Sequence, residues 1–187
     1  MKNKKYQLVA LIGKAGSGKD TILKDVVKAY ELPMNIIVSY TTRPMREGET
    51  GGKEYHFISE EKFKQMINNN QMLEYVQFNN WWYGTAISCL EDDKINIGIF
   101  NPSGIRALIK FQEIDLRIYY IHVSDKQRLL RQLNREEYPD VKEIIRRYSA
   151  DEEDFKNINF DNMQILFNET ERDRLKCCDI ITDYDWF

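Results

Sequence analysis

Apolar positions near the start of the chain follow first one period and then another. Residues 7–12, QLVALI, form a short apolar run that ends at a glycine, which predicts a buried strand. After a glycine-rich segment, apolar residues recur through 21–30 at the spacing of an amphipathic helix. This stripe consists of Ile22, Leu23, Val26, Val27 and Tyr30. We therefore expect the chain to open with a strand, a glycine loop and a helix.

Farther along, helical and strand-like patterns alternate. The strands are expected at 36–38, 55–58, 72–78, 81–85, 95–100, 116–123 and 164–167. The helices are expected at 59–67, 102–111, 125–133, 141–154 and 169–176, with Ser59 and Ser124 as N-caps. Residues 41–53 read as a loop, and Asn79-Asn80 as a hairpin turn. The alternation predicts an α/β fold with a parallel sheet, and the strand-rich stretch from about 40 to 90 reads as an insertion.

Composition narrows the class. The 187 residues suit one domain, and the net charge of −3 does not favour a nucleic-acid partner. No segment approaches the ~20 apolar residues of a membrane helix, so no membrane partner is expected. Cys89, Cys177 and Cys178 have no disulfide or zinc spacing, which favours reduced thiols and a cytoplasmic location.

The segment from Gly13 to Thr21, GKAGSGKDT, matches the phosphate-loop pattern G-x-x-x-x-G-K. Glycines let backbone N–H groups turn toward an oxyanion, the following helix adds its positive end, and Lys19 supplies a point charge. The predicted ATP-binding residues are Gly13, Lys14, Ala15, Gly16, Ser17, Gly18, Lys19, Asp20 and Thr21. Asp20 stands where the pattern has a hydroxyl for Mg²⁺, and Thr21 offers the hydroxyl one position later. The alternative, a flexible Gly/Ser turn, disagrees with the flanking strand and helix.

A second polar cluster follows at 39–57, SYTTRPMREGETGGKEYHF. Arg43 and Arg46 with Tyr55 suit a phosphate monoester, because the guanidinium fork matches phosphate geometry and a phenol adds a neutral donor. The alternative is a solvated, charged loop.

These residues resemble the guanylate kinase family over nearly the whole chain. The second cluster fits its signature S-x-x-T-R-x-x-R-x-G-E-x-x-G-x-[DE]-Y-x-F. The resemblance extends to Glu74 as the acidic residue that reads the base, and to Tyr83-Gly84-Thr85 as the Y-G-[ST] element. It also covers the lid pattern of Arg131 and Arg135, the further arginine Arg147, and Asn168 on the adenine side.

The resemblance implies a set of site residues. Ser39, Arg43, Arg46, Tyr55, Glu74, Tyr83 and Thr85 would bind GMP, and Lys19, Arg43, Arg131, Arg135 and Arg147 would be catalytic. Thr21 would be the metal ligand and Asn168 would contact ATP. The chain departs from the family at Ile99 and Asn101, where the family usually has two aspartates that help to read guanine. The arginines of 128–147 have an alternative reading as a solvated helix face.

The implied fold is a three-layer core of the P-loop NTPase type with a parallel sheet, a small mixed insertion that binds the nucleoside monophosphate, and a helical lid. Within one domain, 1–187, the core would be 1–38, 91–124 and 148–187, the insertion 39–90 and the lid 125–147. The implied activity moves a phosphoryl group from ATP, with Mg²⁺, to GMP or dGMP, in a monomer or homodimer. Two alternatives stay open: a kinase for another nucleoside monophosphate, and a non-catalytic interaction module.

Overall fold

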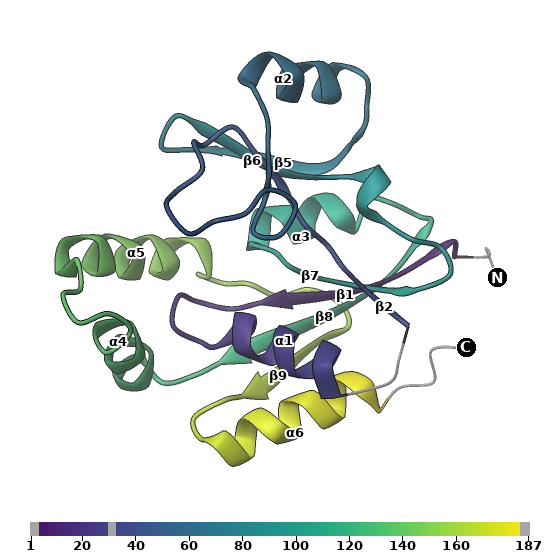
Figure 1. Cartoon of the computed structure of the whole chain (residues 1–187). Coiled ribbons are helices and arrows are strands. Elements are labelled where there is room, and N and C mark those ends of the chain that lie inside the picture. Colours follow the sequence, from purple (N-terminus) through teal and green to yellow (C-terminus); the bar gives the residue numbers. More distant parts are fainter. Residues whose placement is uncertain (1–3, 30–32, 184–187) are drawn as a thin grey trace. The chain divides into compact units, whose positions relative to one another are not determined.

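The computed structural model describes residues 4–29 and 33–183 (Figure 1). The chain divides into two compact units. Unit 1 comprises Met1–Leu8, Pro33–Gly98 and Ser103–Leu116, and unit 2 comprises Val9–Leu32, Ile99–Pro102 and Arg117–Phe187. The expected division into a core, an insertion at 39–90 and a lid at 125–147 stays a prediction.

A five-stranded sheet has the strand order β2-β7-β1-β8-β9. Its members are β1 (Tyr6–Ile12), β2 (Met34–Ile36), β7 (Ile95–Ile99), β8 (Ile114–His122) and β9 (Met163–Phe167). β2 pairs with β7 in parallel, and β8 pairs with β9 in parallel. The five residues from Leu8 to Ile12 are fully buried, as expected for a strand covered on both faces. The predicted α/β class with a parallel sheet is confirmed.

A second sheet, which is mixed and four-stranded, lies in unit 1 and has the order β4-β3-β6-β5. Its strands are β3 (Tyr40–Thr41), β4 (His56–Phe57), β5 (Met72–Phe78) and β6 (Trp81–Ala86). β3 runs parallel to β4 and antiparallel to β6. Asn79 and Asn80, with φ of 48° and 65°, turn β5 into β6, because asparagine tolerates the left-handed conformation that a two-residue hairpin needs.

Helix α2 (Glu60–Asn68) packs against this mixed sheet. Ser59 caps it by accepting the N–H of Lys62. Phe63 and Met66 on its inner face join Met72 and Ala86 of the sheet in an apolar cluster. The sheet therefore has one face that is covered by α2.

The remaining helices are α1 (Lys19–Ala29), α3 (Pro102–Leu108), α4 (Asp125–Leu133), α5 (Val141–Asp154) and α6 (Glu171–Thr182), with a short 3-10 turn at Ile87–Cys89. In unit 2, α1 and α6 pack side by side, and Arg174 pairs with Asp25 between them. Thr170 and Asp173 form a capping box at the start of α6. Within the described residues, no helix combines the length and the apolar character that crossing a bilayer requires.

Four expected elements differ from the structure. The second strand is β2 at 34–36, not 36–38, because Asn35 is held inside the sheet by its amide, which donates to Asn96 Oδ1 at 2.8 Å. β3 lies inside the expected loop 41–53 and depends on pairing with distant strands, which leaves no local pattern. The helix expected at 102–111 ends at Leu108, and the last helix extends to Thr182. Tyr30, expected to end the first helical stripe, lies outside the described residues.

Candidate functional site

The phosphate-loop segment joins the end of β1 to the start of α1 in unit 2. Gly16 and Gly18 have φ of 80° and 90°, a region that favours glycine. A Cβ on Gly16 would lie 2.5 Å from the backbone oxygen of Arg128, and one on Gly18 would lie 2.5 Å from Asn168 Nδ2. Both glycines are therefore required by backbone conformation and by close neighbours.

Lys19 is the first residue of α1, and its side chain turns back over the loop. Its Nζ donates to the carbonyl of Gly13 at 2.6 Å and to that of Lys14 at 3.2 Å. Burial lowers the pKa of Lys19, whereas the charges of Asp20 and Asp151 act to raise it. The first N–H groups of α1 have no partner within the helix, and the helix dipole makes this end positive. An ammonium and the positive end of the helix dipole thus lie at one end of α1.

A cavity of about 500 Å³ lies beside the loop, lined in part by Gly18, Thr21, Arg131 and Asn168. The Arg131 guanidinium donates to the carbonyl of Asn168 at 2.6 Å and to that of Ser17 at 3.3 Å. Asn168 donates from Nδ2 to the carbonyl of Ser17 at 2.7 Å, and its buried Oδ1 has no hydrogen-bond partner among the described residues. The structure thus brings Thr21, Arg131 and Asn168 together next to the phosphate loop.

The other two predicted arginines of this region lie elsewhere. Arg135 comes after α4, which ends at Leu133, so Arg131 and Arg135 do not lie on one helix. The Arg147 side chain is 45% exposed on α5 and donates to Glu143 at 2.7 Å. Their predicted phosphate contacts stay predictions.

Arg128 corrects the reading of 128–147 as a solvated helix face. Its side chain is fully buried and forms ion pairs with Asp125 at 2.8 Å, Asp151 at 3.1 Å and Glu152 at 2.6 Å. The sequence interpretation missed both α5 carboxylates. Nothing in the local pattern marks them, because Asp151 lies 23 residues from Arg128 along the chain.

These α5 carboxylates also contact the phosphate loop. Asp151 Oδ2 accepts the backbone N–H of Ala15 at 2.7 Å, and Glu152 Oε1 pairs with Lys14 Nζ at 2.6 Å. Burial raises the pKa of Asp151, against the opposing effects of the Ala15 N–H and the neighbouring Arg128. Arg128, Asp151 and Glu152, together with their loop partners Lys14 and Ala15, are named the charge network below.

Unit 1 carries the second cluster, beginning with Arg43. The Arg43 guanidinium makes a two-point contact with the Glu49 carboxylate, at 2.9 Å and 2.8 Å, and Glu49 also accepts the Arg46 N–H at 2.7 Å. The hydrogen bond from Arg43, followed by that from the Arg46 N–H, lowers the pKa of Glu49 to about 2. Arg46 as a whole is an exposed residue. Arg43 and the Arg46 backbone therefore already hold an anionic group.

Aromatic rings surround this arginine. The Arg43 guanidinium lies 5.7 Å from the centre of the Tyr55 ring and 5.5 Å from that of Phe57. Tyr55 and Tyr83 meet edge to face, with ring centres 5.9 Å apart. Of the four residues predicted to hold a phosphate, the structure brings Arg43, Tyr55 and Tyr83 together.

Ser39, Glu74 and Thr85 also come together. Thr85 Oγ1 donates to Glu74 Oε1 at 2.7 Å and lies 3.0 Å from Ser39 Oγ. Glu74 is 9% exposed, and burial raises its pKa, although the hydrogen bonds from Thr85 act to lower it. Ile99 and Asn101, where the resemblance led us to expect acids, lie at the end of β7 and just before α3. The chain thus has one buried carboxylate here with capacity to accept further hydrogen bonds.

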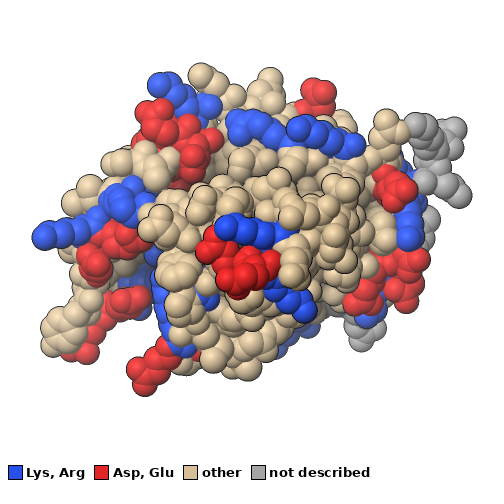
Figure 2. All heavy atoms as spheres, turned by 90° about the horizontal axis from the view of Figure 1, so that it is seen from above, with Lys and Arg blue, Asp and Glu red and all other residues tan. Residues whose placement is uncertain are grey.

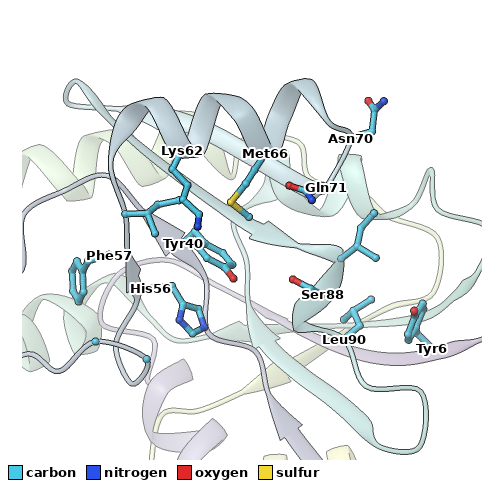
Figure 3. A pocket seen from close by; sticks show the side chains of 14 residues that line it. Tyr6, Tyr40, His56, Phe57, Lys62, Met66, Asn70, Gln71, Ser88 and Leu90 are labelled. Atoms are coloured by element: carbon cyan, nitrogen blue, oxygen red, sulfur yellow. The ribbon is translucent and has the colours of Figure 1, made fainter.

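A larger cavity of about 970 Å³ lies on the α2 side of the mixed sheet and contains none of the predicted site residues. Figure 3 shows Lys62 and Met66 extending from α2 toward Tyr40, whose ring lies 4.7 Å from that of His56. Tyr40 lines this cavity, whereas Ser39, Glu74 and Thr85 do not. This cavity is therefore distinct from the cluster around Glu74.

Among the described residues, no group of three or more His, Cys, Asp or Glu side chains is arranged to hold a metal ion. His122, on β8, contacts the rings of Tyr120 and Phe167. Both described histidines are accounted for by ring packing.

The unit of β1, the phosphate-loop segment and α1 defines an α/β phosphate-loop fold. Comparison with known proteins agrees with this fold class. A family model described as guanylate kinase matches residues 5–176. The chain belongs to the guanylate kinase family.

Individual relatives support this membership. The guanylate kinase of Helicobacter hepaticus is 32% identical over 167 residues, which covers 86% of this chain and 82% of the relative. That of Mycoplasmoides gallisepticum is 39% identical over 92 residues, and this match spans only about half of that relative, 47%. The crystal structure of guanylate kinase from Anaplasma phagocytophilum matches with a TM-score of 0.64 at 20% identity, over 96% of this chain and 85% of that one, and so supports the fold.

Proposed function

We propose that this protein transfers the γ-phosphoryl group of ATP to GMP or dGMP, giving the nucleoside diphosphate. The observation that carries the proposal is the buried Glu74 carboxylate, which has Thr85 as a donor and further capacity to accept. Guanine presents an N1–H and an N2–H₂ group side by side, and one carboxylate accepts both. Adenine lacks this pair, so the buried carboxylate would be left unpaired with AMP.

The donor nucleotide is assigned to unit 2. N–H groups of the segment 13–21, apart from the Ala15 N–H that Asp151 accepts, and the Lys19 ammonium would bind the phosphates of ATP, because they combine a helix N-terminus with a positive charge. Asn168, whose buried Oδ1 has no partner within the part of the chain that the structure describes, would contact the adenine side. Arg131, which lies beside the carbonyl of Ser17, would approach the phosphates.

The acceptor nucleotide is assigned to unit 1. Arg43, Arg46, Tyr55 and Tyr83 would hold its phosphate, and Ser39, Glu74 and Thr85 would contact the guanine. The Glu49 carboxylate is bound to the Arg43 guanidinium. Glu49 either orients this guanidinium or is displaced from it by the incoming phosphate. Both outcomes give an anion-binding position at Arg43.

Magnesium would enter with ATP. Mg²⁺ is commonly held by one or two carboxylates together with substrate phosphates and water, and dedicated protein cages are rare. Asp20, exposed in the first turn of α1, and the Thr21 hydroxyl fit such a set. The ion would neutralise negative charge on the phosphates.

Catalysis would rest on positioning and on charge neutralisation. The acceptor phosphate is its own nucleophile, so no strong base and no covalent enzyme intermediate are required. Lys19, Mg²⁺ and the lid arginines would neutralise charge on the transferring phosphoryl group. Arg135 and Arg147 are assigned to a lid that excludes water when both nucleotides are bound.

The overall charge of the protein does not by itself attract an anionic ligand. Figure 2 shows one face of the molecule, where basic and acidic side chains lie interspersed. With a net charge of −3, phosphate must be met by local donors such as Arg43.

Cys89, Cys177 and Cys178 are free thiols, which suits a reducing cytoplasm. We infer no nucleic-acid or membrane partner, and a monomer or homodimer.

A coupled assay with ATP, Mg²⁺ and each common NMP and dNMP tests the proposal. We expect GMP and dGMP to be the best acceptors. Ile99 and Asn101 favour one alternative, a kinase for a different nucleoside monophosphate, and that alternative is correct if GMP and dGMP are the poorest acceptors.

The variant Lys19→Ala tests the donor assignment. We expect it to lose turnover by about 100-fold or more while its thermal unfolding midpoint stays near that of the wild type. Turnover equal to that of the wild type would remove Lys19 from the mechanism. A wild-type protein with no turnover for any acceptor would favour the non-catalytic interaction module.

A further inference from the structure

The charge network connects two helices to the phosphate loop. Arg128 on α4 binds Asp151 and Glu152 on α5, and these two carboxylates bind Ala15 and Lys14 of the loop. The reaction proposed above gives no role to Arg128, Asp151 or Glu152. All five residues belong to unit 2.

Arg128 is the most deeply buried member. Its side chain is fully buried, and its guanidinium lies 3.9 Å from the centre of the Tyr148 ring on α5. A buried guanidinium is stable only when its donors are paired, so removing a partner leaves an uncompensated charge. Asp151 is the partner that is itself largely buried, with 17% of its side chain exposed.

Asp151 also acts on the loop backbone. Its Oδ2 accepts the Ala15 N–H at 2.7 Å, and a hydrogen bond to an ionised acceptor is stronger than one to a neutral acceptor. Next to Ala15, Lys14 is paired with Glu152, and Gly16 packs against the Arg128 backbone. Three successive loop residues are thus held by α4 and α5, which restricts how the peptide groups between Gly13 and Lys19 are oriented.

We propose that Asp151 is a positioning residue for the donor nucleotide. By binding the Ala15 N–H and Arg128 at once, its carboxylate holds the loop in the conformation in which the remaining N–H groups and the Lys19 ammonium converge on the ATP phosphates. Asp151 itself touches no phosphate in this scheme. The inference rests on the proposed ATP-dependent function and adds a residue outside the phosphate-loop motif on which ATP affinity depends.

Isothermal titration calorimetry with ATP and Mg²⁺, without acceptor, tests the inference. Asp151→Ala removes the acceptor of the Ala15 N–H, and we expect its Kd for ATP to rise about tenfold. Asp151→Asn keeps an oxygen that accepts this N–H, so its Kd is expected to return to within about threefold of the wild type. Glu153→Ala, an exposed position on the same helix, is the matched control and should leave the Kd unchanged.

Titration with GMP separates positioning from general damage. We expect all three variants to bind GMP as the wild type does, because the acceptor residues lie in unit 1. A loss of affinity for GMP that equals the loss for ATP would mean that Asp151 only stabilises the fold, and would overturn the inference.

The double variant Arg128→Met/Asp151→Ala, compared with Arg128→Met, keeps the test valid if Asp151→Ala alone is unstable. The double variant carries neither charge, so its unfolding midpoint should exceed that of Arg128→Met alone. Its ATP affinity should stay low, because the Ala15 N–H still lacks its partner. ATP affinity equal to that of the wild type in either Asp151→Ala protein would overturn the inference. Wild-type protein that binds no ATP would refute the proposed function instead.

Discussion

Thr85 and Glu74 lie on neighbouring strands, β6 and β5, and share a hydrogen bond of 2.7 Å between Oγ1 and Oε1. The hydroxyl uses one of the carboxylate's acceptor positions and orients the group, and Ser39 lies 3.0 Å from the same hydroxyl. A buried carboxylate that is oriented but incompletely paired discriminates among ligands, because only a ligand with matching donors removes the cost of its burial.

Glu74→Gln should lower kcat/KM for GMP by about 100-fold, because the amide replaces a charged acceptor of two guanine donors by one neutral oxygen. The ATP affinity should not change. Steady-state kinetics with varied GMP, together with calorimetry for ATP, measures both quantities. An unchanged kcat/KM for GMP would show that Glu74 does not bind the base.

The pH dependence of the GMP reaction should report Glu74. Because burial raises the pKa of this carboxyl, it gains a proton at a higher pH than an ordinary glutamate, and kcat/KM for GMP should fall on its acid side from that pH. Glu74→Gln should lack this acidic limb. A profile of the same shape in both proteins would assign the limb to another group.

The same raised pKa affects stability with a defined sign. Between the unfolded and folded pKa values of Glu74 the folded chain binds more protons, so its contribution to the free energy of unfolding declines as pH rises through this window. The unfolding midpoint of the wild type should therefore fall relative to that of Glu74→Gln as the pH rises through the window, which thermal unfolding of both proteins measures.

Glu49 is expected to behave in the opposite way. With its pKa at about 2, it stays ionised near pH 4, where an ordinary glutamate is half protonated, and the Arg43 contact is lost only as pH falls further. Its stabilising contribution is therefore complete above the unfolded pKa and disappears as pH approaches about 2.

Carboxyl ¹³C chemical shifts, followed by NMR as the pH is lowered, measure this titration directly. Arg43→Met should move the Glu49 midpoint back toward the ordinary range. A Glu49 midpoint near that range in the wild type would show that the Arg43 contact is weak in solution.

The sequence predicts the strand, loop and helix around Gly13 well, because every signal there is local. The apolar run before Gly13, the glycines and the helical stripe after Lys19 lie within one short segment. The acceptor cluster is different: no pattern in the residues alone pairs Ser39 with Thr85, and only the family resemblance led us to group them.

Contacts between distant segments are what the sequence does not predict. Asn35 lies in β2 because its side-chain amide donates a hydrogen bond to Asn96, 61 positions away. This polar residue interrupts the apolar pattern from which a strand would be predicted. From the sequence alone, Arg128 and Asp151 would each be placed on the exposed face of a charged helix. Their burial depends on how α4 packs against α5, which the periodicity of neither helix encodes.

The burial of Arg128 against Asp151 has a consequence for how this chain changes over generations. Loss of either partner alone strands a charge in the interior, whereas replacing both by apolar groups is tolerated or even favourable. The two positions are therefore expected to co-vary: among relatives, the basic and the acidic residue should be present together or absent together. An alignment in which the two vary independently would contradict this view of the α4–α5 interior.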